Sequence, residues 1–70
     1  MPTPKNSIGK NIKKLRKKQG ISQDRLSKLA DLSLNTIVTV ESGANENPTI
    51  DTLTKIANAL SVGVDNLIQK

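Results

Sequence analysis

The chain has 70 residues, which allows one domain with a compact core. It contains no Cys and no His, which excludes disulfides, thiol chemistry, imidazole acid–base catalysis and the usual zinc ligands. The net charge of +5 is unevenly placed, because residues 1–28 hold nine basic side chains against one carboxylate, whereas residues 29–70 hold two against five.

Local signals predict five short helices and no strand. Residues 1–7 contain two prolines and are expected to form a flexible arm in front of a domain over residues 8–70. Helices are predicted over Ile8–Gln19, Gln23–Ala30, Leu34–Ser42, residues 50–60 and about Val64–Ile68. Their predicted N-caps are Ser7, Ser22, Ser33 and Thr49, and Gly20 is predicted to end the first helix in the left-handed conformation. The expected fold is all-α, with five helices around one aliphatic core.

Apolar spacing assigns a buried side to each helix. The residues expected to point inward are Ile8, Ile12 and Leu15 in the first helix, Leu26 and Leu29 in the second, Ile37 and Val40 in the third, and Ile50, Leu53, Ile56, Ala57 and Leu60 in the fourth. Val38 lies off the apolar stripe of the third helix and is expected on the surface.

The basic N-terminal half fits either a polyanionic partner or a solvated helix face, and charge alone does not decide between them. The composition indicates which kind of polyanion would fit. Because the chain has no Phe, Tyr or Trp, unpaired bases would find no aromatic platform on which to stack. Duplex DNA is therefore favoured over single strands.

Residues 22–42 contain the most informative pattern. Two predicted helices of about two turns follow each other across a short turn, and a Ser opens each one, which is typical of a helix-turn-helix. In that arrangement the first helix lies across the DNA backbone and the second enters the major groove by its N-terminal end. Base-specific donors and acceptors are displayed in this groove.

The joint spacing of small motifs over most of the chain resembles the lambda-repressor-like family, also called Cro-type or XRE-type helix-turn-helix domains. The residues that carry the resemblance are Ile8-Gly9-Lys10-Asn11-Ile12, Leu15-Arg16, Gly20-Ile21-Ser22-Gln23, Leu26, Thr36-Ile37, Glu41, Gly43, Pro48-Thr49-Ile50-Asp51-Thr52-Leu53, Ile56-Ala57 and Leu60. The resemblance implies a sequence-specific regulator of transcription, a repressor acting on double-stranded DNA.

The resemblance also implies a set of site residues. Base edges are expected to be read by Leu34, Asn35, Thr36 and Thr39, and phosphates to be contacted by Gln23, Ser33, Arg16 and Lys10. Asn can bond adenine in bidentate fashion, while Leu and Thr can pack against a thymine methyl group. Arg16 and Glu41 are in addition expected to form a partly buried ion pair that links the first helix to the end of the third.

Three features depart from the family's usual pattern. Ser27 stands where relatives usually have Ala, and Asp31 where they usually have Gly; both are expected to keep the fold, because Ser is small and Asp tolerates positive φ. The loop over residues 44–49 carries one acid and no base, although relatives often place Lys or Arg there. This loop predicts weaker phosphate contact, or a surface used for protein.

A homodimer on a palindromic operator is implied because one recognition helix spans too few base pairs to specify a site. The C-terminal end is apolar and carries little charge, and its residues Leu60, Val62, Val64 and Leu67 are expected to form the dimer surface. Since the patch is small, the dimer is expected to be weak without DNA.

The alternative hypothesis is a protein-interaction module, or an antitoxin-like component, that keeps the fold and binds DNA weakly or only with a partner. The loop and the two apolar residues Leu34 and Val38 favour it. An enzyme is the weakest hypothesis, because the six carboxylates are scattered and there is no glycine-rich phosphate loop. No cofactor, metal or membrane span is expected. The expected location is the cytoplasm, as for a regulator of prokaryotic or phage type.

Overall fold

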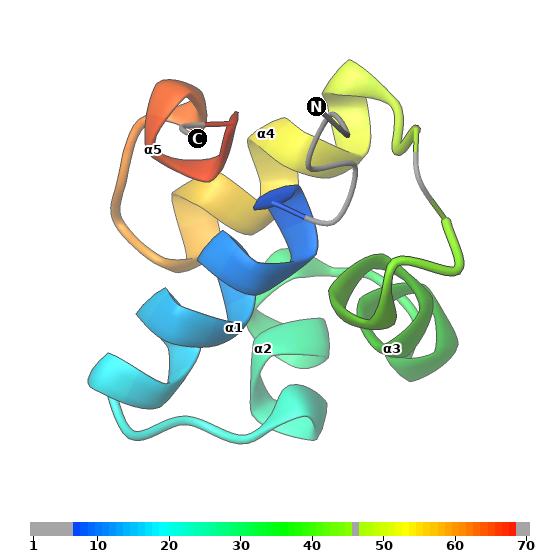
Figure 1. Ribbon diagram of the computed structural model, residues 1–70. Coiled ribbons are helices and arrows are strands. Elements are labelled where there is room, and N and C mark those ends of the chain that lie inside the picture. The colour runs from blue at the N-terminus through cyan, green and yellow to red at the C-terminus, as the bar shows by residue number, and fades with distance from the viewer. Residues whose placement is uncertain (1–6, 46, 69–70) are drawn as a thin grey trace.

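The computed structural model describes residues 7–45 and 47–68, and it is all-helical over these residues. Its five helices are α1 (Ser7–Lys18), α2 (Gln23–Ala30), α3 (Leu34–Ser42), α4 (Ile50–Ala59) and α5 (Val64–Ile68) (Figure 1). The five predicted helices and the all-α class are thus confirmed. α1 both begins and ends one residue earlier than predicted, and α4 ends one residue earlier. The predicted flexible arm falls on residues 1–6, which lie outside the described residues, and on Ser7, which begins α1.

Short polar side chains begin the helices as expected. The hydroxyl oxygens of Ser22, Ser33 and Thr49 each accept a hydrogen bond from the backbone N–H three residues later, at 3.0, 3.1 and 3.1 Å. These bonds satisfy one of the free N–H groups at each helix start. Ser7 is itself the first helical residue of α1, so the expectation that it is the N-cap is wrong.

Left-handed residues end the first three helices. Gly20 and Gly43 have φ values of 71° and 88°, and Asp31 takes the same conformation at φ 57°. Asp is one of the few side chains that tolerate this region, which explains why Gly is not required at position 31. Ser61, with φ 59°, makes the turn after α4, and no local signal in the sequence predicted it.

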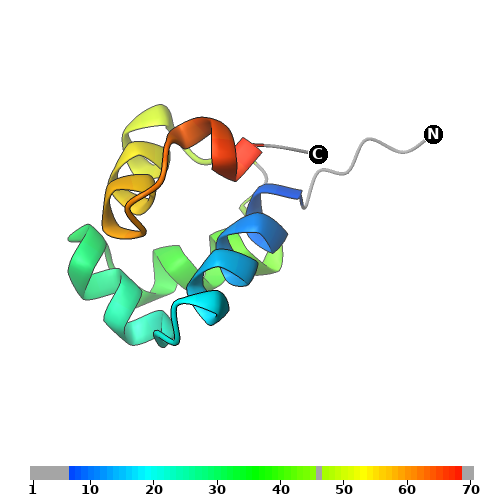
Figure 2. The ribbon, with the colours of Figure 1, turned by 90° about the vertical axis from the view of Figure 1, so that its left-hand side faces the viewer.

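The helices form a closed ring around one core. Each packs mainly against two others, in the order α1–α3–α2–α4–α5–α1. Figure 2 shows this ring from the side, with α1 between α3 and α5. Helices of this length are marginal alone in water, so burial of one side of each in the shared core stabilises them.

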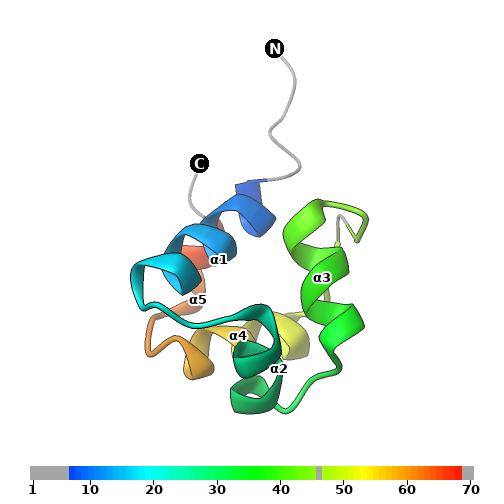
Figure 3. The ribbon, with the colours of Figure 1, turned by 90° about the horizontal axis from the view of Figure 1, so that it is seen from below.

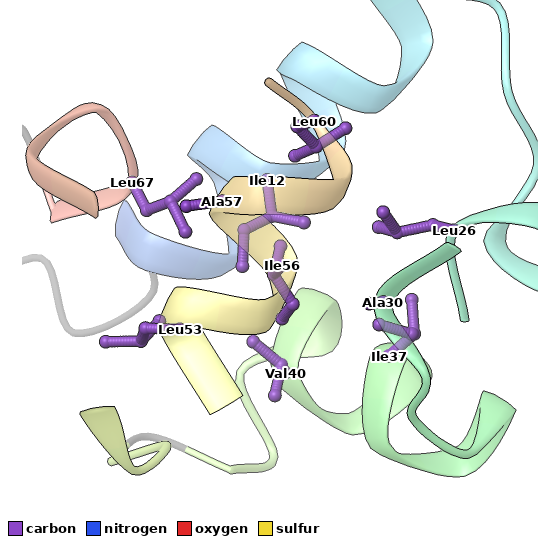
Figure 4. Packing of buried hydrophobic residues seen from close by; sticks show 10 residues of the cluster. All are labelled: Ile12, Leu26, Ala30, Ile37, Val40, Leu53, Ile56, Ala57, Leu60 and Leu67. Carbon is purple, nitrogen blue, oxygen red and sulfur yellow. The ribbon is translucent and has the colours of Figure 1, made fainter. Parts of the chain in front are cut away.

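The core is aliphatic and draws on every helix (Figure 4). Its buried residues are Ile12, Leu26, Ala30, Ile37, Val40, Leu53, Ile56, Ala57, Leu60 and Leu67. Ile8 and Leu15, also predicted to point inward, are partly buried and pack against this cluster.

Two predicted core residues lie on the surface. Leu29 is 48% exposed, because the buried side of α2 is formed by Leu26, Ser27 and Ala30, and Leu29 lies at the edge of that side. Ile50 is 72% exposed, since it is the first residue of α4 and burial along its stripe begins one turn later. Both predictions of burial were wrong.

The C-terminal end is held against α1 by two amide side chains. Asn11 Nδ2 donates to the backbone oxygen of Leu67 at 2.9 Å, and Gln19 Nε2 donates to that of Leu60 at 2.7 Å. The side chains of Leu60 and Leu67 are fully buried in the core of the single chain. The expectation that these two leucines lie on a dimer surface is therefore wrong, because they are already used in folding.

Candidate nucleic-acid interface

The outer side of α3 is not covered by another helix. α3 packs against α1 and α2, and it begins after the tight turn formed by Asp31, Leu32 and Ser33. Figure 3 shows α3 at one edge of the molecule, joined to α2 by this turn. Like every helix start, the N-terminal ends of α2 and α3 carry backbone N–H groups without a partner inside the helix. Such groups are a favourable site for an anion such as phosphate.

A buried polar network connects α1, α2 and α3. Arg16 meets Glu41 through two parallel contacts, Nε to Oε2 at 2.7 Å and Nη2 to Oε1 at 3.1 Å. The two side chains are only 10% and 3% exposed, so water screens the pair weakly. Gln23 Nε2 donates to Glu41 Oε1 at 3.2 Å, and Arg16 Nη1 donates to the backbone oxygen of Ile21 at 2.8 Å. This network fixes the start of α2 relative to the end of α3.

The structure thus brings together three of the predicted site residues, Arg16, Gln23 and Glu41. The spacing of the sequence did not indicate the bond between Gln23 and Glu41, which are 18 residues apart and on different helices. Gln23 stays half-buried, whereas the guanidinium of Arg16 is largely buried behind Glu41. A phosphate contact by either residue stays a prediction.

The residues predicted to read bases occupy the outer side of α3. Leu34 and Asn35 are exposed at its first turn, and Val38 is exposed one turn later. Thr36 and Thr39 are half-buried. The sequence indicated that Val38 is exposed, in favour of a protein-interaction surface, but assigned it no role in base reading.

Positive charge comes from α1 and α2 rather than from α3. The exposed basic residues of α1 are Lys10, Lys13, Lys14, Lys17 and Lys18, and none forms an ion pair with a described carboxylate. On α2, Arg25 is exposed and Lys28 is paired with Asp24 at 3.2 Å, an exposed pair. Lys10, the predicted phosphate contact, lies one residue after the buried Gly9.

Within residues 7–45 and 47–68, no group of three or more His, Cys, Asp or Glu is placed to hold a metal ion. None of the helices in the described part of the chain is long and apolar enough to cross a membrane.

The comparisons with known proteins agree with this arrangement. The helix-turn-helix family model HTH_3 matches residues 12–67. No curated protein matches the chain. Among solved structures, the N-terminal DNA-binding domain of SinR from Bacillus subtilis has a TM-score of 0.88 at 31% identity, covering 93% of this chain and 94% of that one. The restriction-modification controller protein C.AhdI from Aeromonas hydrophila has a TM-score of 0.86 at 28% identity, covering 91% and 96%.

A third solved structure has a similar fold at lower sequence identity. The clp gene regulator ClgR from C. glutamicum has a TM-score of 0.83 at 19% identity, covering 97% of this chain and 87% of that one.

Proposed function

Because this chain belongs to the helix-turn-helix family of XRE type, whose members bind DNA and regulate transcription, we propose that it is a sequence-specific repressor acting as a homodimer on a palindromic operator. The observation that carries this proposal is the outer side of α3, where Leu34, Asn35 and Val38 are exposed while the opposite side is buried in the core. An α-helix with one free side fits the major groove of B-DNA.

Phosphate contacts orient the domain on the duplex. Gln23 stands at the start of α2 and Ser33 caps α3, and in this proposal the free N–H groups at the starts of both helices contact the phosphate backbone. Lys10 adds an exposed ammonium group from α1. Arg16 acts chiefly through Glu41, which holds Gln23 in place. Three of the five N–H groups of Arg16 bond Glu41 and Ile21, so one N–H on each terminal nitrogen is left to contact a phosphate.

Dimerisation in this proposal uses the outer side of α5. With Leu60 and Leu67 buried, the apolar side chains that stay available there are the half-buried Val62 and Val64 and the exposed Ile68. Val64 and Ile68 are four residues apart and share one side of the helix. This patch is far below the total area of about 1,200 Å² that stable complexes bury, so pairing depends on DNA.

A salt titration with duplex DNA tests the proposal. Each phosphate neutralised lowers the slope of log affinity against log salt by about 0.9, and three to five contacts per subunit predict a slope of roughly −3 to −5. Replacing Lys10 by Gln should bring the slope about one unit closer to zero. A flat dependence, or no duplex binding at low salt, would overturn the proposal.

The second candidate function is a protein-interaction module, for example an antitoxin-like component. The same two apolar side chains favour it, since Leu34 and Val38 are 44% and 38% exposed and the described loop residues after α3 carry no base. In that case Leu34→Ser would weaken binding to a protein partner and leave the salt-dependent binding to DNA unchanged.

A further inference from the structure

The outer side of α3 carries only apolar and uncharged polar side chains. Its side chains are those of Leu34, Asn35, Val38, Thr39 and Ser42. α3 contains no Lys, Arg, Gln or Asp, and its one acid, Glu41, is buried in the pair with Arg16. No side chain of this helix can therefore present an exposed charge to a base.

The hydroxyl groups of α3 each form a hydrogen bond within the helix or with its N-cap. Thr39 Oγ1 donates to the backbone oxygen of Thr36 at 3.1 Å, and Ser42 Oγ donates to that of Thr39 at 3.2 Å. The hydroxyls of Ser33 and Thr36 bond each other at 2.8 Å. Among the described residues of α3, only Asn35 has a polar side chain that is exposed and makes no hydrogen bond in the domain.

The exposed side chains of α3 favour some base pairs over others. Guanine is read mainly by Arg or Lys at its O6 and N7, and cytosine by Asp or Glu at its N4, and none of these is exposed on α3. Adenine is read by the amide of Asn, which donates to N7 and accepts from N6. The 5-methyl group of thymine is read by apolar side chains such as those at positions 34 and 38.

Building on the proposed function, we propose that the base pairs read by α3 are A·T pairs. Asn35 bonds one adenine, and Leu34 and Val38 pack against the 5-methyl groups of thymines. Leu34 and Val38 are one helical turn apart on the same side, so they contact successive positions along the groove. Val38 thereby becomes a specificity-determining residue, a role that the family's base-reading positions did not assign to it.

Selection from a random duplex pool with the full chain, followed by removal of single methyl groups, tests this inference. The selected half-site should be occupied by A·T pairs where α3 docks. Each contacted thymine is then replaced by deoxyuridine, which lacks only the 5-methyl group. The expected loss of affinity is about fourfold per contacted thymine, the effect of exposing one buried methyl-sized group.

Two variants sharpen the test. Val38→Ala should keep the helix, because Ala is the better helix former, and should abolish the effect of deoxyuridine at one position. Ile50→Ala is the matched control, since Ile50 is more exposed than Val38 but lies on α4. The Ile50→Ala protein should bind the selected duplex with the same affinity as the original chain, and deoxyuridine should reduce the affinity of both proteins equally.

The outcomes separate this inference from the proposed function. Enrichment of G·C pairs, or equal affinity for thymine and deoxyuridine at every position of a selected site, overturns the A·T assignment and leaves a sequence-specific regulator. Salt-dependent binding without any enriched sequence also overturns it, and leaves a non-specific DNA-binding protein. Absence of duplex binding at low salt overturns the proposed function itself.

Discussion

Gly9 of α1 lies directly against the backbone of Val40 and Glu41 near the end of α3. A Cβ built at Gly9 would lie 2.6 Å from the carbonyl oxygen of Glu41, and closer still to that of Val40. Real Cβ atoms do not approach backbone oxygens so closely, so only glycine allows the two helices to pack at this distance. Arg16 follows two turns later in α1 and reaches the side chain of the same Glu41.

Gly9→Ala is therefore expected to destabilise the domain. In an exposed helix the same change would stabilise by roughly 1 kcal/mol, but here overpacking against backbone should cost about 1–3 kcal/mol. Thermal unfolding followed by circular dichroism measures the difference. Gly20→Asn is the control, because Gly20 has nothing within 4 Å and Asn tolerates its positive φ. A Gly9→Ala protein that melts at or above the original temperature would contradict the role of this contact.

The ion pair between Arg16 and Glu41 should couple strongly in a double-mutant cycle. Glu41→Ala leaves a buried guanidinium without its partner, which commonly costs about 3 kcal/mol or more, whereas Arg16→Met combined with Glu41→Ala should cost less than either single change. Chemical denaturation of all four proteins gives the coupling free energy. The exposed pair of Asp51 and Lys55 is the control, and Asp51→Asn should change stability by less than about 1 kcal/mol. An unchanged midpoint for Glu41→Ala would show that the pair contributes nothing.

Replacing Gln23, a predicted phosphate contact, and Asn35, a predicted base contact, should have different effects on DNA binding. Gln23→Ala should weaken binding to all duplexes alike, because a phosphate contact carries no sequence information. Asn35→Ala should instead lower discrimination at one or two base pairs, by about 1–3 kcal/mol per position. Affinities for a selected site and for its single-base variants, measured at one salt concentration, decide between these patterns. The assignment would be reversed if Gln23→Ala changed base preference and Asn35→Ala did not.

Pairing on DNA should depend on operator spacing. Two half-sites with centres one helical turn apart, roughly 34 Å, should bind two chains cooperatively, whereas a single half-site should bind one chain more weakly. Ile68→Ser should reduce the cooperativity without changing affinity for the single half-site, because Ile68 is 51% exposed and outside the core. Equal affinity per chain on one and two half-sites would rule out the cooperative dimer.

Features set by local chemistry were predictable from the sequence. The starts of α2, α3 and α4 follow from Ser22, Ser33 and Thr49, whose hydroxyls bond backbone groups only three residues away. The stops at Gly20 and Asp31 follow from the conformational freedom of single residues. Helical periodicity similarly identified most of the core.

Features set by neighbours in space were not predictable. Leu29 fits a helical apolar pattern as well as Leu26 does, but the position of α2 against α3 and α4 buries one and exposes the other. Leu60 and Leu67 belong to an apolar C-terminal segment that could equally have faced a partner, and their burial was decided when α4 and α5 packed on α1.

By itself, the sequence determined the five helices and the N-caps of α2, α3 and α4, because each depends on residues within a few positions of one another. The tertiary structure alone decided that Glu41 accepts hydrogen bonds from both Arg16 and Gln23, and that Gly9 lies against Val40. These contacts join residues 18 to 31 positions apart on different helices. Such pairs are fixed only when the ring of helices closes, since their geometry depends on how whole helices pack rather than on any local preference.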